Sequence, residues 1–151
     1  MTLVSIAELA TAQQLFELQC RVSRKWIPYH AKKDTIISLD FVVIDSEGND
    51  IWAQVPLDSV RIFGTQLEDK KCYLLATFKL TSIKEDFCPV PNPLMIQFNG
   101  DTTVQPIDPI PTAPPSKFPF IKVVDISKYH NVTVDLLFGL LITYRLCFLF
   151  K

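Results

Sequence analysis

Glycine, histidine and paired cysteine are scarce in this sequence of 151 residues, which holds four glycines, two histidines and four cysteines. With so few glycines, no glycine-rich phosphate loop and no G-x-S-x-G nucleophile motif occurs. The histidines lie in different segments and no C-x-x-C pair exists, so neither a catalytic constellation nor a zinc site is expected. The sequence therefore predicts a protein that is not an enzyme and needs no cofactor.

A strong charge of one sign and a long apolar run are also lacking. The net charge of -1 gives no overall basic field, so a nucleic-acid partner has to be argued from local clusters of charge. Residues 136–150 are very apolar but are interrupted by Gly139 and Arg145, and they fall short of the roughly 20 residues of a membrane span. A membrane anchor is not expected. Because no secretory signal is visible, the four cysteines are expected to be free thiols in a reducing compartment.

What the sequence does contain is a series of short strand patterns. Residues 5–15 are expected to form a short helical lead-in that Ser5 and Glu8 begin. Apolar residues then alternate in 16–23, 37–43 and 51–55, with a polar turn at 45–50. Residues 58–69 fit a short helix capped by Asp58 or Ser59, and 72–83 and 94–98 are strand-like.

This order of elements predicts the fold class. Three strands, a helix and two more strands within about a hundred residues are typical of an all-β, five-stranded OB-fold barrel with Greek-key connections. The short helix stands between strands three and four. A small β-sandwich is the second interpretation.

A basic and aromatic cluster is the main candidate for a binding site. It consists of Arg21, Arg24, Lys25, Trp26, Tyr29, Lys32 and Lys33, at the end of the first strand and in the loop that follows. Such a mixture suits single-stranded DNA, because cations track phosphates and flat rings stack on bases at about 1 to 3 kcal/mol each.

Three aromatic side chains allow two interpretations each. Alternation turns Trp52 away from the core, where it either lies open in the groove of an OB fold or packs under a loop. Trp26 either contacts the ligand or plugs one end of the barrel. Phe87, in a charged turn with Lys84, is expected to cap the groove rather than to fill the barrel end.

Two short motifs carry a resemblance to a known family. They are the D-x-x-G-x-x-I turn of Asp45, Gly48 and Ile51 and the F-N-x-x-T-x-V run of Phe98, Asn99, Thr102 and Val104. With the flanking strands, residues 3 to about 140 resemble a DNA-binding OB domain of the replication protein A large subunit, closest to its divergent plant forms. The family's basic position on strand three falls on Trp52, and its two stacking aromatics fall on Pro56 and Phe87.

The resemblance implies a function and a domain plan. It implies a nuclear module that binds single-stranded DNA in replication, repair or recombination, with other replication protein A subunits as further partners. The expected plan is an OB domain in 1–105, a proline-rich linker in 106–119, and in 120–151 the start of a second OB domain that is cut short and ends in an apolar tail. The alternative function is an OB-fold protein-interaction module that has lost DNA binding.

Overall fold

The computed structural model describes residues 1–9, 15–30, 33–83 and 89–114, excepting the side chains of Tyr29 and His30. The elements in chain order are β1 (Thr2–Leu3), the 3-10 turn η1 (Ile6–Glu8), β2 (Phe16–Trp26), β3 (Tyr29–His30), β4 (Thr35–Ile36), β5 (Ser38–Ile44), β6 (Asp50–Pro56), the 3-10 turn η2 (Leu57–Ser59), α1 (Val60–Gln66), β7 (Cys72–Ala76), β8 (Lys79–Ser82), β9 (Leu94–Gln97) and β10 (Thr103–Pro106).

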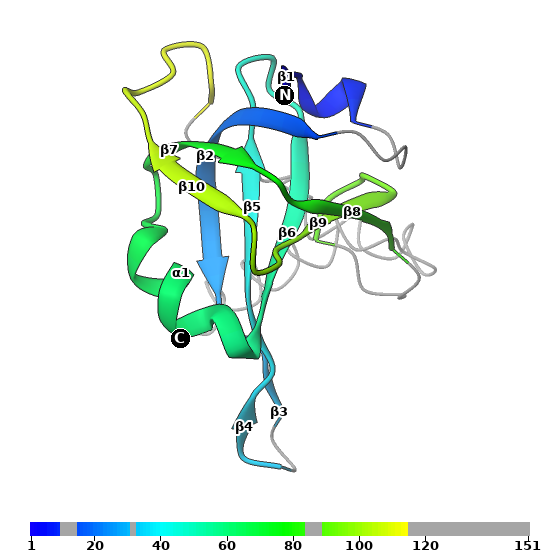
Figure 1. The fold of residues 1–151 in the computed structure, drawn as a ribbon, viewed down its shortest axis with the longest axis vertical. Coiled ribbons are helices and arrows are strands. Elements are labelled where there is room, and N and C mark those ends of the chain that lie inside the picture. The colour runs from blue at the N-terminus through cyan, green and yellow to red at the C-terminus, as the bar shows by residue number, and fades with distance from the viewer. Residues whose placement is uncertain (10–14, 31–32, 84–88, 115–151) are drawn as a thin grey trace, which may run out of the picture.

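The main sheet curls back on itself. Its strand order is β10-β7-β2-β5-β6-β9-β8, so β7 and β8, which follow each other in the chain, lie at or near opposite ends of the series (Figure 1). They are separated only by Thr77 and Phe78, and Thr77 makes the bend with a φ of 58°. The ladder of β6 with β9 is parallel, and the ladders of β2 with β5 and β7 are antiparallel. This is the predicted all-β OB-fold barrel, with its fourth strand divided in two.

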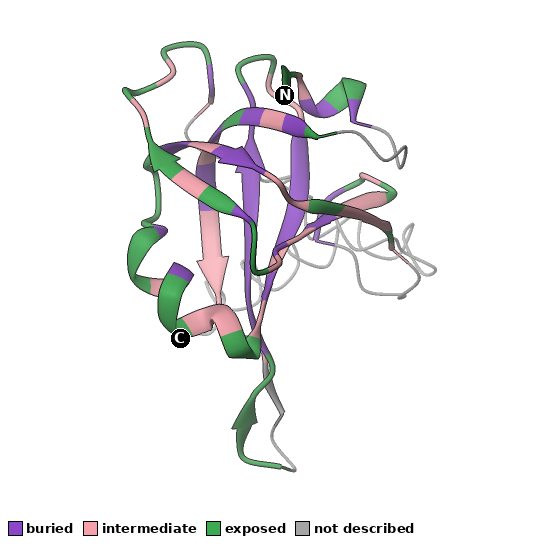
Figure 2. Cartoon of the chain, viewed as in Figure 1, coloured by how far each residue is buried: buried purple, intermediate pink, exposed green. Residues whose placement is uncertain are grey.

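The barrel interior is filled by the alternate residues that the sequence predicts. Leu18, Phe41, Ile51 and Ile96 are fully buried in one cluster contributed by four strands. Phe98 packs edge-on against Phe41 and Phe63, with ring centroids 5.4 and 4.9 Å apart. Figure 2 shows β5 and β6 as the most deeply buried strands, and β5 is buried on both of its faces.

Local signals at the first hairpin are also confirmed. The Asp45 carboxylate accepts hydrogen bonds from the backbone N–H groups of Glu47 and Asn49, and Gly48 has a φ of 84°. Asp45 also accepts from the N–H of Ile6, so the turn anchors the N-terminal lead-in. In that lead-in the Glu8 carboxylate accepts from the backbone and hydroxyl of Ser5, as a helix start requires.

Two expectations need correction. Ile37 was expected in the core but is 51% exposed, because β5 begins at Ser38 and Ile37 belongs to the hairpin junction. The helix predicted over 58–69 is shorter, and Ser59 precedes it without a capping hydrogen bond from its side chain. The described part of the stretch 106–119, expected as a linker, contacts the barrel: Ala113 is buried, and the N–H of Ile107 donates to the carbonyl of Cys72. Residues 115–151, including the apolar tail, lie outside the described residues.

The two cysteines in the described part are free and buried, as expected. Cys20 is fully buried between β5 and β7, and this burial raises the pKa of its thiol, with smaller contributions from Cys72 and Asp45. A thiol held neutral in this way is a core side chain rather than a nucleophile.

Candidate nucleic-acid interface

A β-bulge in β2 decides which way the basic and aromatic residues point. Val22 is paired with Val43 and Arg24 with Val42, so Ser23 is an extra residue in this strand. Simple alternation would put Arg24 on the same side as Val22, inside the barrel. The extra residue shifts the alternation, so that Arg24 and Trp26 lie on the outer face and Lys25 on the inner one.

Two rows of side chains cross the outer wall of the barrel from β2 to β8. Residues directly opposite each other in a ladder point to the same face, so the register of the ladders from β2 to β8 defines both rows. The first row is Arg24, Val42, Trp52, Met95 and Thr81, and the second row is Trp26, Asp40, Gln54, Gln97 and Lys79. Together these ten residues are called the outer face. OB folds bind oligonucleotides on this side of the second and third barrel strands, which are β5 and β6 in this structure.

The second row is polar and accessible. Trp26, Gln54 and Gln97 are half-buried and Lys79 is exposed. Asp40 is buried at the floor of the row, where its Oδ1 accepts from the Ser38 hydroxyl at 2.6 Å and from Gln54 Nε2 at 3.2 Å. These bonds fix the Gln54 amide in place. The row thus offers an aromatic ring at one end, amides in the middle and a cation at the other end.

The first row is closed by the chain itself. Residues 89–93, the cover segment, bring Val90 into a cluster with Val42 and Trp52, and Trp26, Ile83 and Met95 pack around it. Trp52 is only 4% exposed. Its ring is on the predicted face, and of the two interpretations left open for it the structure shows the second, a ring packed under a loop.

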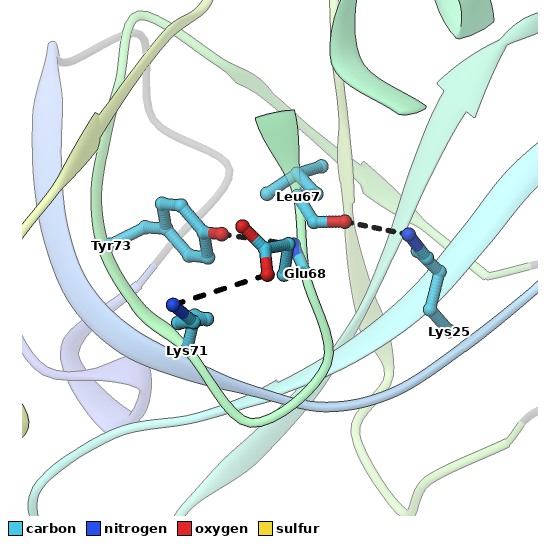
Figure 3. Close-up of polar contacts among 5 residues, drawn as sticks. All are labelled: Lys25, Leu67, Glu68, Lys71 and Tyr73. Carbon is cyan, nitrogen blue, oxygen red and sulfur yellow. Dashed lines mark hydrogen bonds and ion pairs between the residues drawn. The ribbon is translucent and has the colours of Figure 1, made fainter. Parts of the chain in front are cut away.

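Lys25 was predicted to contact DNA, and the structure gives its ammonium another partner. Lys25 Nζ donates to the Leu67 carbonyl at 2.6 Å (Figure 3). It also donates to the Gly64 carbonyl at 3.4 Å. These carbonyls belong to the C-terminal end of α1, where a cation satisfies unpaired acceptors and the helix dipole. In the neighbouring turn the Tyr73 hydroxyl accepts from the N–H of Glu68.

Arg21 also lies away from the outer face. Its guanidinium donates to the carbonyls of Ala113 at 2.8 Å and Ile110 at 3.3 Å, and so holds residues 110–113 on the wall beside β7. Ile44 and Cys72, the ladder partners of Arg21 in β5 and β7, are buried. In this structure the guanidinium of Arg21 therefore has a structural role, and its predicted contact with DNA stays a prediction.

The remaining predicted residues divide between the projecting hairpin and parts that are not described. The hairpin β3–β4 extends from one end of the barrel, and Lys33 is exposed on it (Figure 1). The backbone of Tyr29 pairs with Ile36 in this hairpin. Lys32, Lys84 and Phe87 lie outside the described residues.

The structure adds three residues that the sequence prediction did not include in the site. Gln54, Gln97 and Lys79 share a row with Trp26. Alternation in the third and fifth strands already turns the two glutamines outward with Trp52, and this signal could have included them. Lys79 could not be found in the same way, because its face depends on the bend at Thr77.

The described residues contain neither a metal-binding cluster nor a membrane-spanning helix. Across residues 1–9, 15–30, 33–83 and 89–114, no group of three or more histidine, cysteine, aspartate or glutamate side chains could hold a metal ion. Within the same ranges, no helix is both long and apolar enough to cross a membrane.

Known proteins resemble this chain in sequence and in fold. The profile of a family described as "Domain of unknown function DUF223" matches residues 7–125, and so includes the segment held by Arg21. No curated protein matches the sequence significantly.

Solved structures with the same fold include OB domains. A chain of a replication protein A heterotrimer bound to ssDNA aligns with a TM-score of 0.66 and 20% identity, over 83% of this chain and 29% of its own length. DNA-binding domain A of replication protein A from S. cerevisiae aligns with a TM-score of 0.53 and 21% identity, over 71% of this chain and 95% of that domain. An OB domain from Methanosarcina mazei aligns with a TM-score of 0.54 and 19% identity, over 72% of this chain and 87% of that domain. This chain thus spans less than a third of the heterotrimer chain.

Proposed function

The chain belongs to the DUF223 family, and from this and its outer face we propose that it is a module that binds single-stranded DNA. The second row is the observation that carries the proposal. In it Trp26 can stack on a base, Gln54 and Gln97 can hydrogen-bond to base edges or sugars, and Lys79 can pair with a phosphate. The row crosses the side of the barrel that OB folds use for oligonucleotides. The exposed Lys33 of the hairpin is a further candidate for a phosphate contact.

The alignment with replication protein A domains supports this ligand class, since one of those chains was solved bound to ssDNA. The same proposal extends to the cellular process and to the protein partners. We propose a non-enzymatic role in nuclear replication, repair or recombination, with replication protein A subunits as further partners. With a net charge of -1 and few cations on the outer face, the isolated domain binds weakly.

A second function is favoured by one observation. Ile27, Ile36 and Ile37 are 51%, 43% and 51% exposed around the hairpin, and Leu57 at the neighbouring end of β6 is 52% exposed. An apolar patch of this kind suits a protein partner. The alternative is therefore an OB-fold protein-interaction module that uses the hairpin and not the second row.

Salt dependence separates the two functions. Binding of a fluorescent oligo-dT, followed by anisotropy at about 50 mM and about 200 mM salt, is expected to weaken strongly at the higher salt because phosphate contacts release counterions. Lys79→Met is expected to reduce the slope of log affinity against log salt by about 0.7, the value for one contact to a single strand. Lys71→Met is the control, because this exposed lysine lies in the turn before β7. Undetectable binding at low salt, or equal losses in both variants, would refute the proposed function.

A further inference from the structure

Val90 is the side chain that the cover segment contributes to the apolar cluster on the outer face, where Trp26, Ile83 and Met95 also pack. Val90 is 2% exposed, and it lies against Val42 and Trp52, which are 1% and 4% exposed. Because Val42 and Trp52 are paired across β5 and β6, they form one continuous apolar surface under the segment.

Two polar contacts hold the cover segment at its ends. Arg24 Nη2 donates to the carbonyl of Pro89 at 2.8 Å. Asn92 Nδ2 donates to the carbonyl of Asp50 at 3.2 Å, and its Oδ1 accepts from the N–H of Leu94 at 3.0 Å, where β9 begins. The guanidinium that faces the groove is thus occupied by a backbone carbonyl.

The sequence of the cover segment keeps it separate from the sheet. Its five residues, Pro-Val-Pro-Asn-Pro, include three prolines, which have no N–H to donate to a ladder. Between Pro89 and Asn92 the contacts named above are made by side chains. At the other end of the segment the Pro93 carbonyl accepts from the backbone N–H of Ile83 at 2.9 Å, and β9 beyond it is held by ladders to β6 and β8. The segment can therefore lift from the face without breaking those ladders.

The indole nitrogen of Trp52 gives an independent indication of a ligand. Trp52 Nε1 is buried, and no hydrogen-bond acceptor reaches it within the described part of the chain. A buried donor without an acceptor is destabilising, and indole N–H groups are usually paired when buried. The covered state therefore leaves a donor on the face that a ligand oxygen could satisfy.

Resting on the proposed function, we propose that the cover segment inhibits the groove and that single-stranded DNA displaces it. A nucleotide reproduces both of its main contacts: a phosphate oxygen replaces the Pro89 carbonyl on Arg24, and a base replaces Val90 on Trp52. Binding to the first row then requires the open form, so that affinity is reduced by the fraction of molecules that are open.

The test compares Val90→Ser with Val104→Ser. Val104 is a half-buried valine of β10 that packs against the main core, so its variant controls for general loss of packing. Acrylamide quenching, measured in a Trp26→Phe background so that only Trp52 emits, is expected to rise in Val90→Ser alone. With Trp26 retained, Val90→Ser is expected to bind oligo-dT at low salt about tenfold more tightly than the parent chain, because the open form changes from a minor to the main population.

The outcomes are distinct. If Val90→Ser exposes Trp52 without tightening the binding of oligo-dT, or leaves the quenching unchanged, the cover segment is no inhibitor. If neither the parent chain nor Val90→Ser binds oligo-dT, the proposed function fails, whatever the quenching shows, and this inference fails with it. Should Val90→Ser lose its cooperative urea transition, Asn92→Ala, which removes the contact to Asp50 but keeps the apolar cluster, is measured in its place with the same expected results.

Discussion

Trp52 illustrates the difference between the side on which a residue lies and its exposure. The period-two pattern of β6 correctly places its ring opposite Ile51 and Ala53, but exposure depends on Val90, some forty residues later in the chain. A platform open to DNA would make Trp52→Ala a binding variant with normal stability. The structure supports a different outcome.

Trp52→Ala is expected to lower the free energy of unfolding by about 3 kcal/mol, because a large buried ring is replaced by a cavity. Urea denaturation followed by circular dichroism measures this loss. Trp26→Ala serves as the comparison, since its half-buried ring should cost less stability. Equal and small losses in the two variants would mean that Val90 does not bury Trp52 in solution.

Lys25 and Lys33 can be compared in the same way as the two tryptophans, because they have the same side chain in different surroundings. Lys25→Met is expected to lower the free energy of unfolding by about 1 to 2 kcal/mol, because two carbonyls at the end of α1 lose their donor. Its oligo-dT affinity should stay close to that of the parent chain.

Lys33→Met is expected to show the reverse, with unchanged stability and weaker binding, because its side chain is exposed on the hairpin. Urea denaturation measures the stability of each variant, and oligo-dT anisotropy measures its affinity. A Lys25→Met protein that binds less well than Lys33→Met would place the Lys25 ammonium in the groove after all.

At the scale of elements, the sequence predicts strands better than their connections. The core residues of β2, β5 and β6 follow from alternation, and the hairpin turn follows from Asp45 and Gly48. The bulge at Ser23 has no such local signal. It appears only in the pairing with β5, and because it exchanges the faces of Arg24 and Lys25, the predicted basic cluster is divided among different surfaces.

The contacts of the proline-rich segment could not be read from the sequence. Its prolines suggest a linker, and in the structure Arg21 donates to the carbonyls of Ile110 and Ala113 while the N–H of Ile110 lies 3.5 Å from the sulfur of Cys72. Proline cannot join a ladder, yet its carbonyl neighbours can still accept hydrogen bonds from a side chain.

Arg21→Ala is expected to release this segment and to expose the thiol of Cys72, whose sulfur accepts from the N–H of Ile110 at 3.5 Å. Alkylation followed by peptide mass spectrometry should show faster labelling of Cys72 than in the parent chain. Cys20 is the internal control, because it is fully buried in the barrel. Unchanged labelling of Cys72 would show that Arg21 does not hold the segment in place.

For the whole molecule, the order of elements was enough to predict the barrel, while the site needed the closed sheet. Trp26 and Gln54 share a row through the ladders of β5 with β2 and β6, whereas Lys79 joins this row only because β8 pairs with β9, which lies beside β6. Of the predicted site, Arg24, Trp26 and Trp52 lie on the outer face, and Arg21 and Lys25 do not.

The central claim is that single-stranded DNA binds along the second row of the outer face. An NMR titration of the labelled protein with a short oligo-dT tests it most directly, by following the indole N–H of Trp26 and the side-chain amides of Gln54 and Gln97. These signals are expected to shift together with added DNA, while the backbone signals of α1 and of Lys71 stay in place. If the shifts instead gather at Ile36, Ile37 and Leu57 while the Trp26, Gln54 and Gln97 signals do not move, the second row is not the binding site.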